Sequence, residues 1–151
     1  MNRSIVWKIK PFSQLSTEEL YQILKIRQEV FIVEQTCYYL DADGYDQQAV
    51  HIWAEKEGEI LAYSRVFEPG IKYKEASIGR VLTNPNYRKN KLGKILIRFS
   101  INTIEARFRT QSIRISAQDY LLHFYSEFGF QDTGKKYLED DIPHTEMVRV
   151  I

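Results

Sequence analysis

The sequence lacks the features that mark secreted and membrane-spanning proteins. One cysteine, Cys37, occurs in 151 residues, so no disulfide can form within the chain, and we expect a reducing, cytoplasmic environment. No stretch approaches the roughly 20 apolar residues of a transmembrane helix, and "MNRSIVWKIKPF" lacks the apolar core of a signal peptide. Only seven glycines and four prolines are present, at turn-like positions. We therefore expect neither a membrane partner nor a disulfide scaffold.

Several ligand classes are also excluded. A net charge of +1 gives no general support for nucleic-acid binding. The nucleotide signatures G-x-x-x-x-G-K-[ST] and G-x-G-x-x-G are absent. "DADGYD" (41–46) does not match a calcium loop, because its glycine is fourth and the twelfth residue is Ile52. Asp, His and Cys are too scattered for a zinc pattern, so no metal is expected.

What remains is an ordinary globular composition that indicates one domain, residues 1–151. Apolar, β-branched or alternating runs predict strands at 5–9, 49–55, 60–68, 76–83 and 112–117. Residues 135–151 indicate a loop followed by a terminal strand. Helices and strands alternate along the chain, which predicts an α/β fold with a mixed sheet.

Three segments have helical patterns. Ser16 and Glu19 form a capping-box pattern before a predicted helix whose apolar face holds Leu20, Ile23, Leu24, Arg27 and Phe31. Apolar residues at spacings of three and four predict a second helix over 92–108, with Leu92, Ile95, Leu96, Phe99 and Thr103 on one face. Residues 118–130 predict a short helix that ends at Gly129.

Between strand 76–83 and helix 92–108 lies a strongly basic turn. Residues 84–98 contain five basic side chains and no acid: Arg88, Lys89, Lys91, Lys94 and Arg98. Backbone N–H groups at the start of a helix favour anions, and Gly93 permits close approach of a ligand to the backbone. The turn is therefore typical of a phosphate-binding site, although a solvated charged turn stays open as the alternative.

This turn resembles the acyl-CoA signature of the GNAT family of N-acyltransferases. "RKNKLG" (88–93) is similar to [RQ]-x-x-G-x-[GA] between a strand and a helix, with Lys91 in place of the first glycine. "FYSEFGF" (124–130) is similar to the family's Y-x-x-x-G-F. Segments 27–51, 78–81, 116–130 and 137–144 together resemble the ElaA-type subfamily.

The resemblance implies a GNAT fold, with a mixed central sheet flanked by helices, and direct transfer of an acetyl group from acetyl-CoA to a primary amine in a ternary complex. It implies that Tyr125 lies beside the thioester, where its phenol can protonate the departing thiolate. Cys37 is expected to be a packing residue and not an acyl carrier. The implied cofactor-binding residues are Val81, Leu82, Thr83, Arg88, Lys89, Asn90, Lys91, Leu92, Gly93 and Lys94.

The acceptor and the base are less defined. No residue declares itself as the base, and a water chain could replace one; the possible bases are Glu34, Asp46, His51, Glu55, Glu139 and His144. His51 lies in an apolar strand and is also explained as a half-buried, hydrogen-bonded histidine, whereas His144 follows Pro143 in a polar segment and is slightly more suggestive of a base. Two acidic segments, 41–46 and 139–141, suggest that carboxylates attract a cationic small-molecule or peptide amine. A homodimer is left open. The candidate acceptor-side residues are Arg27, Phe31, Glu34, Asp43, Asp46, His51, Glu139, Asp140 and His144.

Three alternatives stay open. A non-catalytic acyl-CoA sensor would keep the basic turn but would not need Tyr125. Arg27-x-x-x-Phe31, followed by Asp43 and Asp46, is similar to the N-terminal pattern of acyl-homoserine-lactone synthases, although this chain is shorter. A nucleic-acid binder could use the cations at 88–98, but the sequence lacks the broad basic face that such a role needs.

Overall fold

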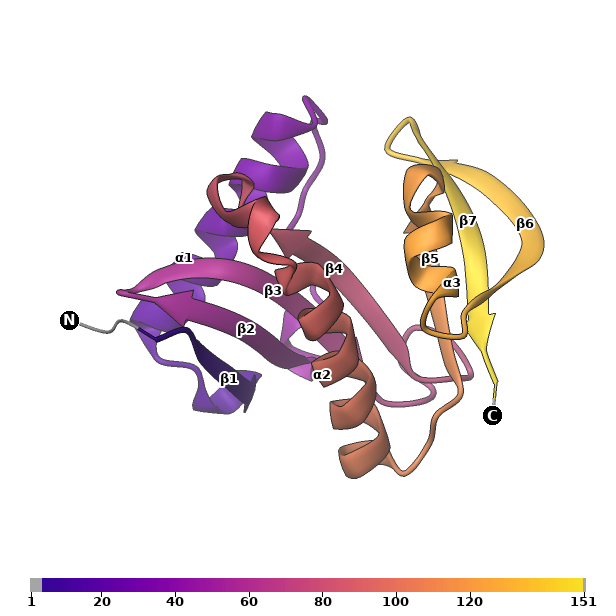
Figure 1. Cartoon of the computed structure of the whole chain (residues 1–151), viewed down its shortest axis with the longest axis horizontal. Helices are drawn as coiled ribbons and strands as arrows, with labels where there is room; N and C mark the ends of the chain where they lie inside the picture. Colours follow the sequence, from indigo (N-terminus) through magenta and orange to yellow (C-terminus); the bar gives the residue numbers. More distant parts are fainter. Residues whose placement is uncertain (1–3, 151) are drawn as a thin grey trace.

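The computed structural model describes residues 4–150, apart from the side chains of Lys89 and Asn90. Figure 1 shows two sheets side by side, with helices packed against them. The strands are β1 (Val6–Pro11), β2 (Val50–Lys56), β3 (Glu59–Phe67), β4 (Ser77–Thr83), β5 (Ile113–Gln118), β6 (Gln131–Glu139) and β7 (Ile142–Arg149). The helices are α1 (Thr17–Arg27), the π-helix η2 (Gln28–Glu34), α2 (Leu92–Phe108) and α3 (Leu122–Ser126). Short 3₁₀ turns are η1 (Phe12–Gln14), η3 (Asp46–Gln48), η4 (Pro85–Asn90) and η5 (Asp119–Leu121).

The two sheets meet along β4 and β5. The first sheet has the antiparallel order β1-β2-β3-β4, and the second has the antiparallel order β5-β7-β6. A parallel bridge joins Ala76 to Ile113, where the amide of Arg114 donates to the Ala76 carbonyl at 2.8 Å. Beyond this bridge β4 and β5 are not paired with each other, and they diverge (Figure 1). The mixed arrangement expected from the sequence is thus two antiparallel halves with one parallel contact.

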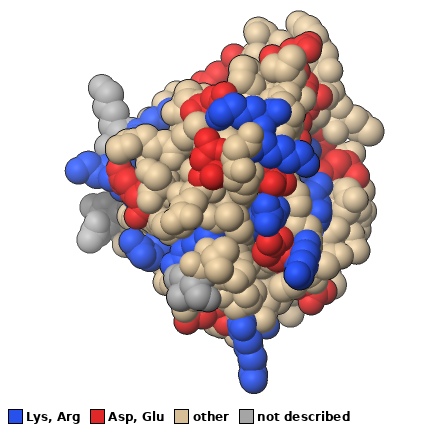
Figure 2. All heavy atoms as spheres, turned by 90° about the vertical axis from the view of Figure 1, so that its right-hand side faces the viewer, with Lys and Arg blue, Asp and Glu red and all other residues tan. Residues whose placement is uncertain are grey.

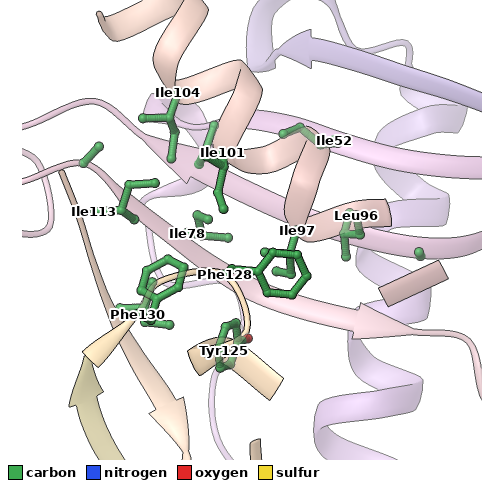
Figure 3. Packing of buried hydrophobic residues seen from close by; sticks show 14 of the residues in the cluster. Ile52, Ile78, Leu96, Ile97, Ile101, Ile104, Ile113, Tyr125, Phe128 and Phe130 are labelled. Atoms are coloured by element: carbon green, nitrogen blue, oxygen red, sulfur yellow. The ribbon is translucent and has the colours of Figure 1, made fainter. Parts of the chain in front are cut away.

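Helix α2 has the bounds predicted from its periodicity, and it covers one face of the first sheet. Leu96, Ile97 and Ile101 are buried against that sheet in the main core, beside Ile52 and Ile78 (Figure 3). Ile95 was expected on the buried face but is 42% exposed. The buried stripe is therefore rotated towards Ile97 and Ser100.

Helix α1 and η2 cover the opposite face of the same sheet. The predicted capping box is confirmed: the Glu19 amide donates to Ser16 Oγ at 3.0 Å, and the Ser16 amide donates to Glu19 Oε1 at 2.9 Å. Ile23 and Phe31 pack with Trp53 in a second core cluster. These contacts fix η2 beside the divergent end of β4, because Leu82 belongs to the same cluster.

The C-terminal region differs from the prediction. Residues 131–139 form strand β6, which pairs with β7 in a hairpin, whereas the sequence predicted a loop from residue 135. The helix predicted over 118–130 is shorter, since the segment forms η5 and then α3. Gly129 has φ 88° and ends the turn after α3, which is the conformation expected of it.

Figure 2 views the molecule from the side of this second sheet, and acidic and basic side chains are interspersed over that face without a broad basic surface.

Candidate active site

A cleft opens where β4 and β5 diverge. Its volume is about 760 Å³, within the range of small-ligand pockets. Its walls come from η2, β3, β4, the basic turn, β5, α3 and the β6–β7 turn. Eleven of the residues proposed from the sequence lie in its lining: Phe31, Glu34, Val81, Leu82, Thr83, Arg88, Gly93, Tyr125, Glu139, Asp140 and His144.

The basic turn is built by local hydrogen bonds. Asn84 ends β4: its side chain accepts from the Asn86 amide at 3.0 Å and donates to the Ile60 carbonyl at 3.0 Å. After η4, α2 begins directly behind Lys91, and no described side chain caps its first turn. The first amides of α2 are therefore without the side-chain partner that usually satisfies them, which suits an anion.

Lys91 adopts the backbone conformation that favours glycine. Its φ of 55° and ψ of 25° are left-handed. For a residue with a Cβ atom this conformation costs roughly 1–2 kcal/mol. Lys91 thus has a glycine-like backbone conformation at the position where the resembled signature has glycine.

Gly93 faces the cleft. A Cβ atom added there would lie 3.7 Å from Phe124 Cζ and 3.7 Å from Thr83 Cγ2, which is ordinary contact. Both neighbours also line the cleft. The protein itself therefore has room for a side chain, and the bare backbone is open to a ligand.

Two cations of this region, Arg88 and Lys94, already have carboxylate partners. The Arg88 guanidinium donates to Glu34 at 2.9 Å and 2.6 Å and to the Thr83 carbonyl at 3.3 Å. Lys94 pairs with Glu127 at 3.0 Å and lies outside the cleft, in a second hollow on the outer face of α2. The side chain of Leu92 lies in the core, so only its amide can serve a ligand. The side chains of Lys89 and Asn90 lie outside the described part of the chain.

Tyr125 enters the cleft from α3. The residue is buried, and its ring meets Phe124 edge-on with centroids 5.3 Å apart and Phe130 at 5.8 Å (Figure 3). Burial raises the pKa of Tyr125 above its ordinary value. A tyrosine phenol is neutral at pH 7, and burial keeps this one protonated, so its hydrogen is in place for donation to a departing thiolate.

Strand β4 carries an irregularity at the cleft. Tyr63 pairs with Leu82 and Arg65 with Gly79, so one residue of β3 opposes two residues of β4. Arg80, inside this bulge, has φ 50°. A bulge leaves backbone groups of the strand unpaired. Arg80 is not among the site residues predicted from the sequence, although it lies in the segment 78–81 that resembles the ElaA-type subfamily.

The acidic segment 41–46 does not line the cleft, contrary to expectation. Arg27 binds Asp41 at 2.8 Å and Asp46 at 2.7 Å, in a buried pairing. Arg65 binds Asp43 and, at 2.8 Å, Asp46. Since neither Arg27 nor these aspartates belong to the cleft lining, the prediction that they face the acceptor is wrong.

Arg80 completes this network of three arginines and three aspartates. It donates to Asp41 at 2.8 Å and to Asp43 at 3.4 Å. Burial works to raise the pKa of both Asp43 and Asp46, but the arginine contacts outweigh it and hold both values below normal. The carboxylates are charged and neutralised within the fold, so they do not present a free negative surface.

His51 is a core residue. It is fully buried, with Nδ1 2.7 Å from the Tyr63 hydroxyl and Nε2 2.9 Å from the Asp46 carbonyl. A carbonyl only accepts, so Nε2 carries the hydrogen and Nδ1 accepts from Tyr63. Both ring nitrogens are used, which agrees with the structural explanation of His51 and not with a role as base.

The half of the cleft opposite the basic turn contains polar residues that the sequence did not single out. Tyr39, Tyr73, Ser116 and Gln118 line it, and they come from two loops and from β5. Cys37 also lines it, and its thiol lies 3.1 Å from the Asp140 carbonyl. Burial and then nearby carboxylates raise the pKa of this thiol, so it is a poor nucleophile.

Within the described residues, no three His, Cys, Asp or Glu side chains gather as a metal site would require. None of the helices in the described part of the chain combines the length and apolarity needed to cross a bilayer.

Comparisons with known proteins agree with the geometry. The family model described as an acetyltransferase (GNAT) domain matches residues 13–151. Protein ElaA of Escherichia coli is 35% identical over 149 residues, which are 97% of each chain. The chain belongs to the GNAT family and is ElaA-like.

Solved structures support the same assignment. An acyl-CoA N-acyltransferase from Pseudomonas aeruginosa has a TM-score of 0.90 at 36% identity, over 96% of this chain and 99% of that one. The crystal structure of E. coli ElaA has a TM-score of 0.87 at 36% identity, over 95% of this chain and 99% of the ElaA chain. The acyl-homoserine-lactone synthase LasI has a TM-score of 0.72 over 97% of this chain and 90% of the LasI chain, but at 12% identity it shows the fold alone. The GNAT fold and an acyltransferase of this family are thereby established, and the acceptor is not.

Proposed function

We propose that this GNAT protein transfers an acetyl group from acetyl-CoA to a primary amine, directly, within a ternary complex in the cleft between β4 and β5. The observation that carries the proposal is that the basic turn and the Tyr125 phenol line one cleft, whose opposite half has polar walls. Acyl donor and amine can therefore meet in one cavity without a covalent enzyme intermediate.

The basic turn would hold the cofactor phosphates. The first amides of α2 would donate hydrogen bonds to an anion, and Lys91 and Arg88 would add positive charge beside it. Gly93 would let the phosphates approach the backbone. Val81, Leu82 and Thr83 at the divergent end of β4 would pair with the amide-containing arm of the cofactor, because this edge has no neighbouring strand.

The bulge in β4 and Tyr125 would perform the chemistry. An unpaired N–H in the bulge near Arg80 would donate to the acetyl carbonyl as negative charge develops on its oxygen. The amine nitrogen forms the C–N bond while the C–S bond breaks. Tyr125 then gives its proton to the departing thiolate. Cys37 has no step in this route.

The proposal is tested by two measurements on the wild-type protein. Calorimetry with acetyl-CoA should show one site per chain, and free thiol should then appear when primary amines such as spermidine, a lysine peptide and phenylethylamine are added. Mass spectrometry should find the acetyl group on the amine and not on the protein. Binding of acetyl-CoA without thiol release from any amine would favour the non-catalytic sensor.

A further inference from the structure

We propose that His144 is the base that removes the proton from the attacking amine, with Glu139 as its partner. This inference rests on the proposed acetyl transfer and adds the group that the reaction still lacks. His144 is in β7, it lines the cleft, and its side chain is 7% exposed.

The hydrogen bonds of His144 define which nitrogen is free. Nδ1 lies 2.7 Å from the carbonyl oxygen of Ile142. A carbonyl only accepts, so Nδ1 must carry a hydrogen. In the neutral ring Nε2 then carries no hydrogen, and its lone pair can accept a proton, as a base requires. The carboxylate of Glu139 lies 3.4 Å from Nε2 and can accept a hydrogen bond from that atom once it is protonated.

The other histidines cannot serve in this way. His51 uses both ring nitrogens in the core and does not line the cleft. The side chain of His123 is 92% exposed and pairs with Glu127 at 3.6 Å, outside the cleft lining. Glu34, another candidate base in the cleft, is already bound to Arg88 on the cofactor side.

The surroundings of His144 hold its ring in place. Tyr137 of β6 stacks on it, with centroids 6.1 Å apart and planes at 17°, and the Tyr137 hydroxyl donates to Ser116. Gln118 of β5 is its register partner. The charged groups on this side of the cleft are Glu139 and Asp140 of the β6–β7 turn and Lys72 of the facing loop, whose charge interacts with Glu139. Tyr73 is the further titratable group of that loop.

The proton balance of the reaction is then complete. The amine nitrogen bonds to the acetyl carbon, and the proton that it loses goes to Nε2 of His144. The imidazolium is stabilised by Glu139, which is half exposed and can pass the proton to solvent. The thiolate takes its proton from Tyr125, and the phenolate takes one back from solvent when the products leave, so amide, free thiol and the starting enzyme result.

His144→Asn tests the assignment, because an asparagine amide can keep the donor to the Ile142 carbonyl and removes the base. With an amine that the wild type acetylates, kcat/KM at pH 7 should fall about 10²- to 10⁴-fold, while acetyl-CoA affinity stays unchanged. The loss should shrink at high pH, where the amine deprotonates without help. His123→Asn is the matched control and should behave as wild type.

Glu139→Gln provides a second readout that packing alone would not move. The carboxylate stabilises the imidazolium, so its removal should shift the acidic limb of the kcat/KM profile to lower pH. A His144→Asn variant with the wild-type pH profile, or a loss that is equal at every pH, would overturn the assignment while leaving acetyl transfer intact. A wild type that acetylates no amine would instead refute the proposed function and this role with it.

Discussion

The guanidinium of Arg88, in the basic turn, is bound by the carboxylate of Glu34 in η2, with N–O distances of 2.9 and 2.6 Å. Both side chains line the cleft. A phosphate that binds the turn must share this guanidinium with Glu34 or displace it. The pair therefore couples the π-helix η2 to the cofactor site, and it places a negative charge where an anion is proposed to bind.

Glu34→Gln should strengthen acetyl-CoA binding. The substitution removes a competing carboxylate and a repulsive charge, and because the pair is 45% and 36% exposed, the gain should be modest, about two- to fivefold in Kd. Calorimetry at low and at physiological salt measures it, and the gain should diminish with salt. Glu29→Gln, an exposed acid on the same helix, is the control and should leave Kd unchanged. Weaker binding in Glu34→Gln would show that Glu34 contacts the cofactor favourably.

Gly93→Ala should separate protein stability from cofactor binding. The new methyl group fits, with its nearest neighbours at 3.7 Å, and alanine is a better helix former than glycine by roughly 0.8–1 kcal/mol. The unliganded variant should therefore unfold at higher urea concentration than wild type. Its affinity for acetyl-CoA should fall, because the methyl group occupies the open backbone.

Gly93→Asp extends this comparison. It adds a like charge beside the phosphates, so binding should weaken by at least ~2 kcal/mol, the scale of losing charge-assisted hydrogen bonds. A folded Gly93→Asp variant that binds acetyl-CoA as wild type does would show that the phosphates lie elsewhere.

Lys91→Gly should relieve backbone strain and remove one cation. The left-handed φ of 55° costs roughly 1–2 kcal/mol for lysine and little for glycine, so the variant should lose less stability than Lys91→Ala, which keeps the strain. If the ammonium contacts a phosphate, both variants should show a shallower salt dependence of acetyl-CoA binding. Lys91→Ala with wild-type affinity at low salt would refute a compensating charge.

The elements with a local cause were predictable from the sequence. The bounds of α2 and the Ser16–Glu19 box depend on neighbours three or four positions away, and both are as expected. The basic turn is equally local, since a strand end, a left-handed residue and a helix start follow one another. These features define α1, α2 and the basic-turn side of the cleft.

Features that depend on distant partners were not predictable. Asp41 is neutralised by Arg27, 14 positions before it, and by Arg80, 39 positions after it, and no spacing rule connects them. Strand β6 has mostly exposed polar side chains and owes its conformation to backbone pairing with β7, so it lacks the alternation that marks a half-buried strand. His51 and His144 both lie in strands, and only the tertiary contacts distinguish the core residue from the one in the cleft.

Asp46→Asn should destabilise the protein and alter its response to acid. The carboxylate is bound by Arg27 and Arg65, and removing one partner of a buried pair costs on the order of 3 kcal/mol. The pKa values of Asp43 and Asp46 lie below their ordinary value of 3.8 in the folded protein. Their stabilisation is therefore complete above that pH and is lost as pH falls through the folded values.

Urea unfolding at pH 7, 5 and 3.5 measures both effects. The contribution of these carboxylates to the free energy of unfolding of wild type should be nearly constant from pH 7 to pH 5 and smaller at pH 3.5. Asp46→Asn should lose less unfolding free energy than wild type between pH 5 and pH 3.5. Glu105→Gln, an exposed substitution on α2, is the control for a generic change of charge. Equal acid sensitivity of Asp46→Asn and wild type would refute a linked network.

Tyr125→Phe distinguishes an enzyme from a sensor. The substitution keeps the ring and its edge-on contacts with Phe124 and Phe130 and deletes only the hydroxyl. Because burial raises the pKa of Tyr125, the phenol is protonated throughout the useful pH range and can donate to a departing thiolate. Loss of a general acid should lower kcat by about 10²- to 10⁴-fold, with acetyl-CoA affinity nearly unchanged.

Tyr120→Phe is the matched control for Tyr125→Phe, since Tyr120 also lines the cleft but is 74% exposed. Thiol release under saturating acetyl-CoA, together with calorimetry for binding, measures both quantities. Near-normal turnover in Tyr125→Phe would reduce Tyr125 to a packing residue and require another donor for the thiolate.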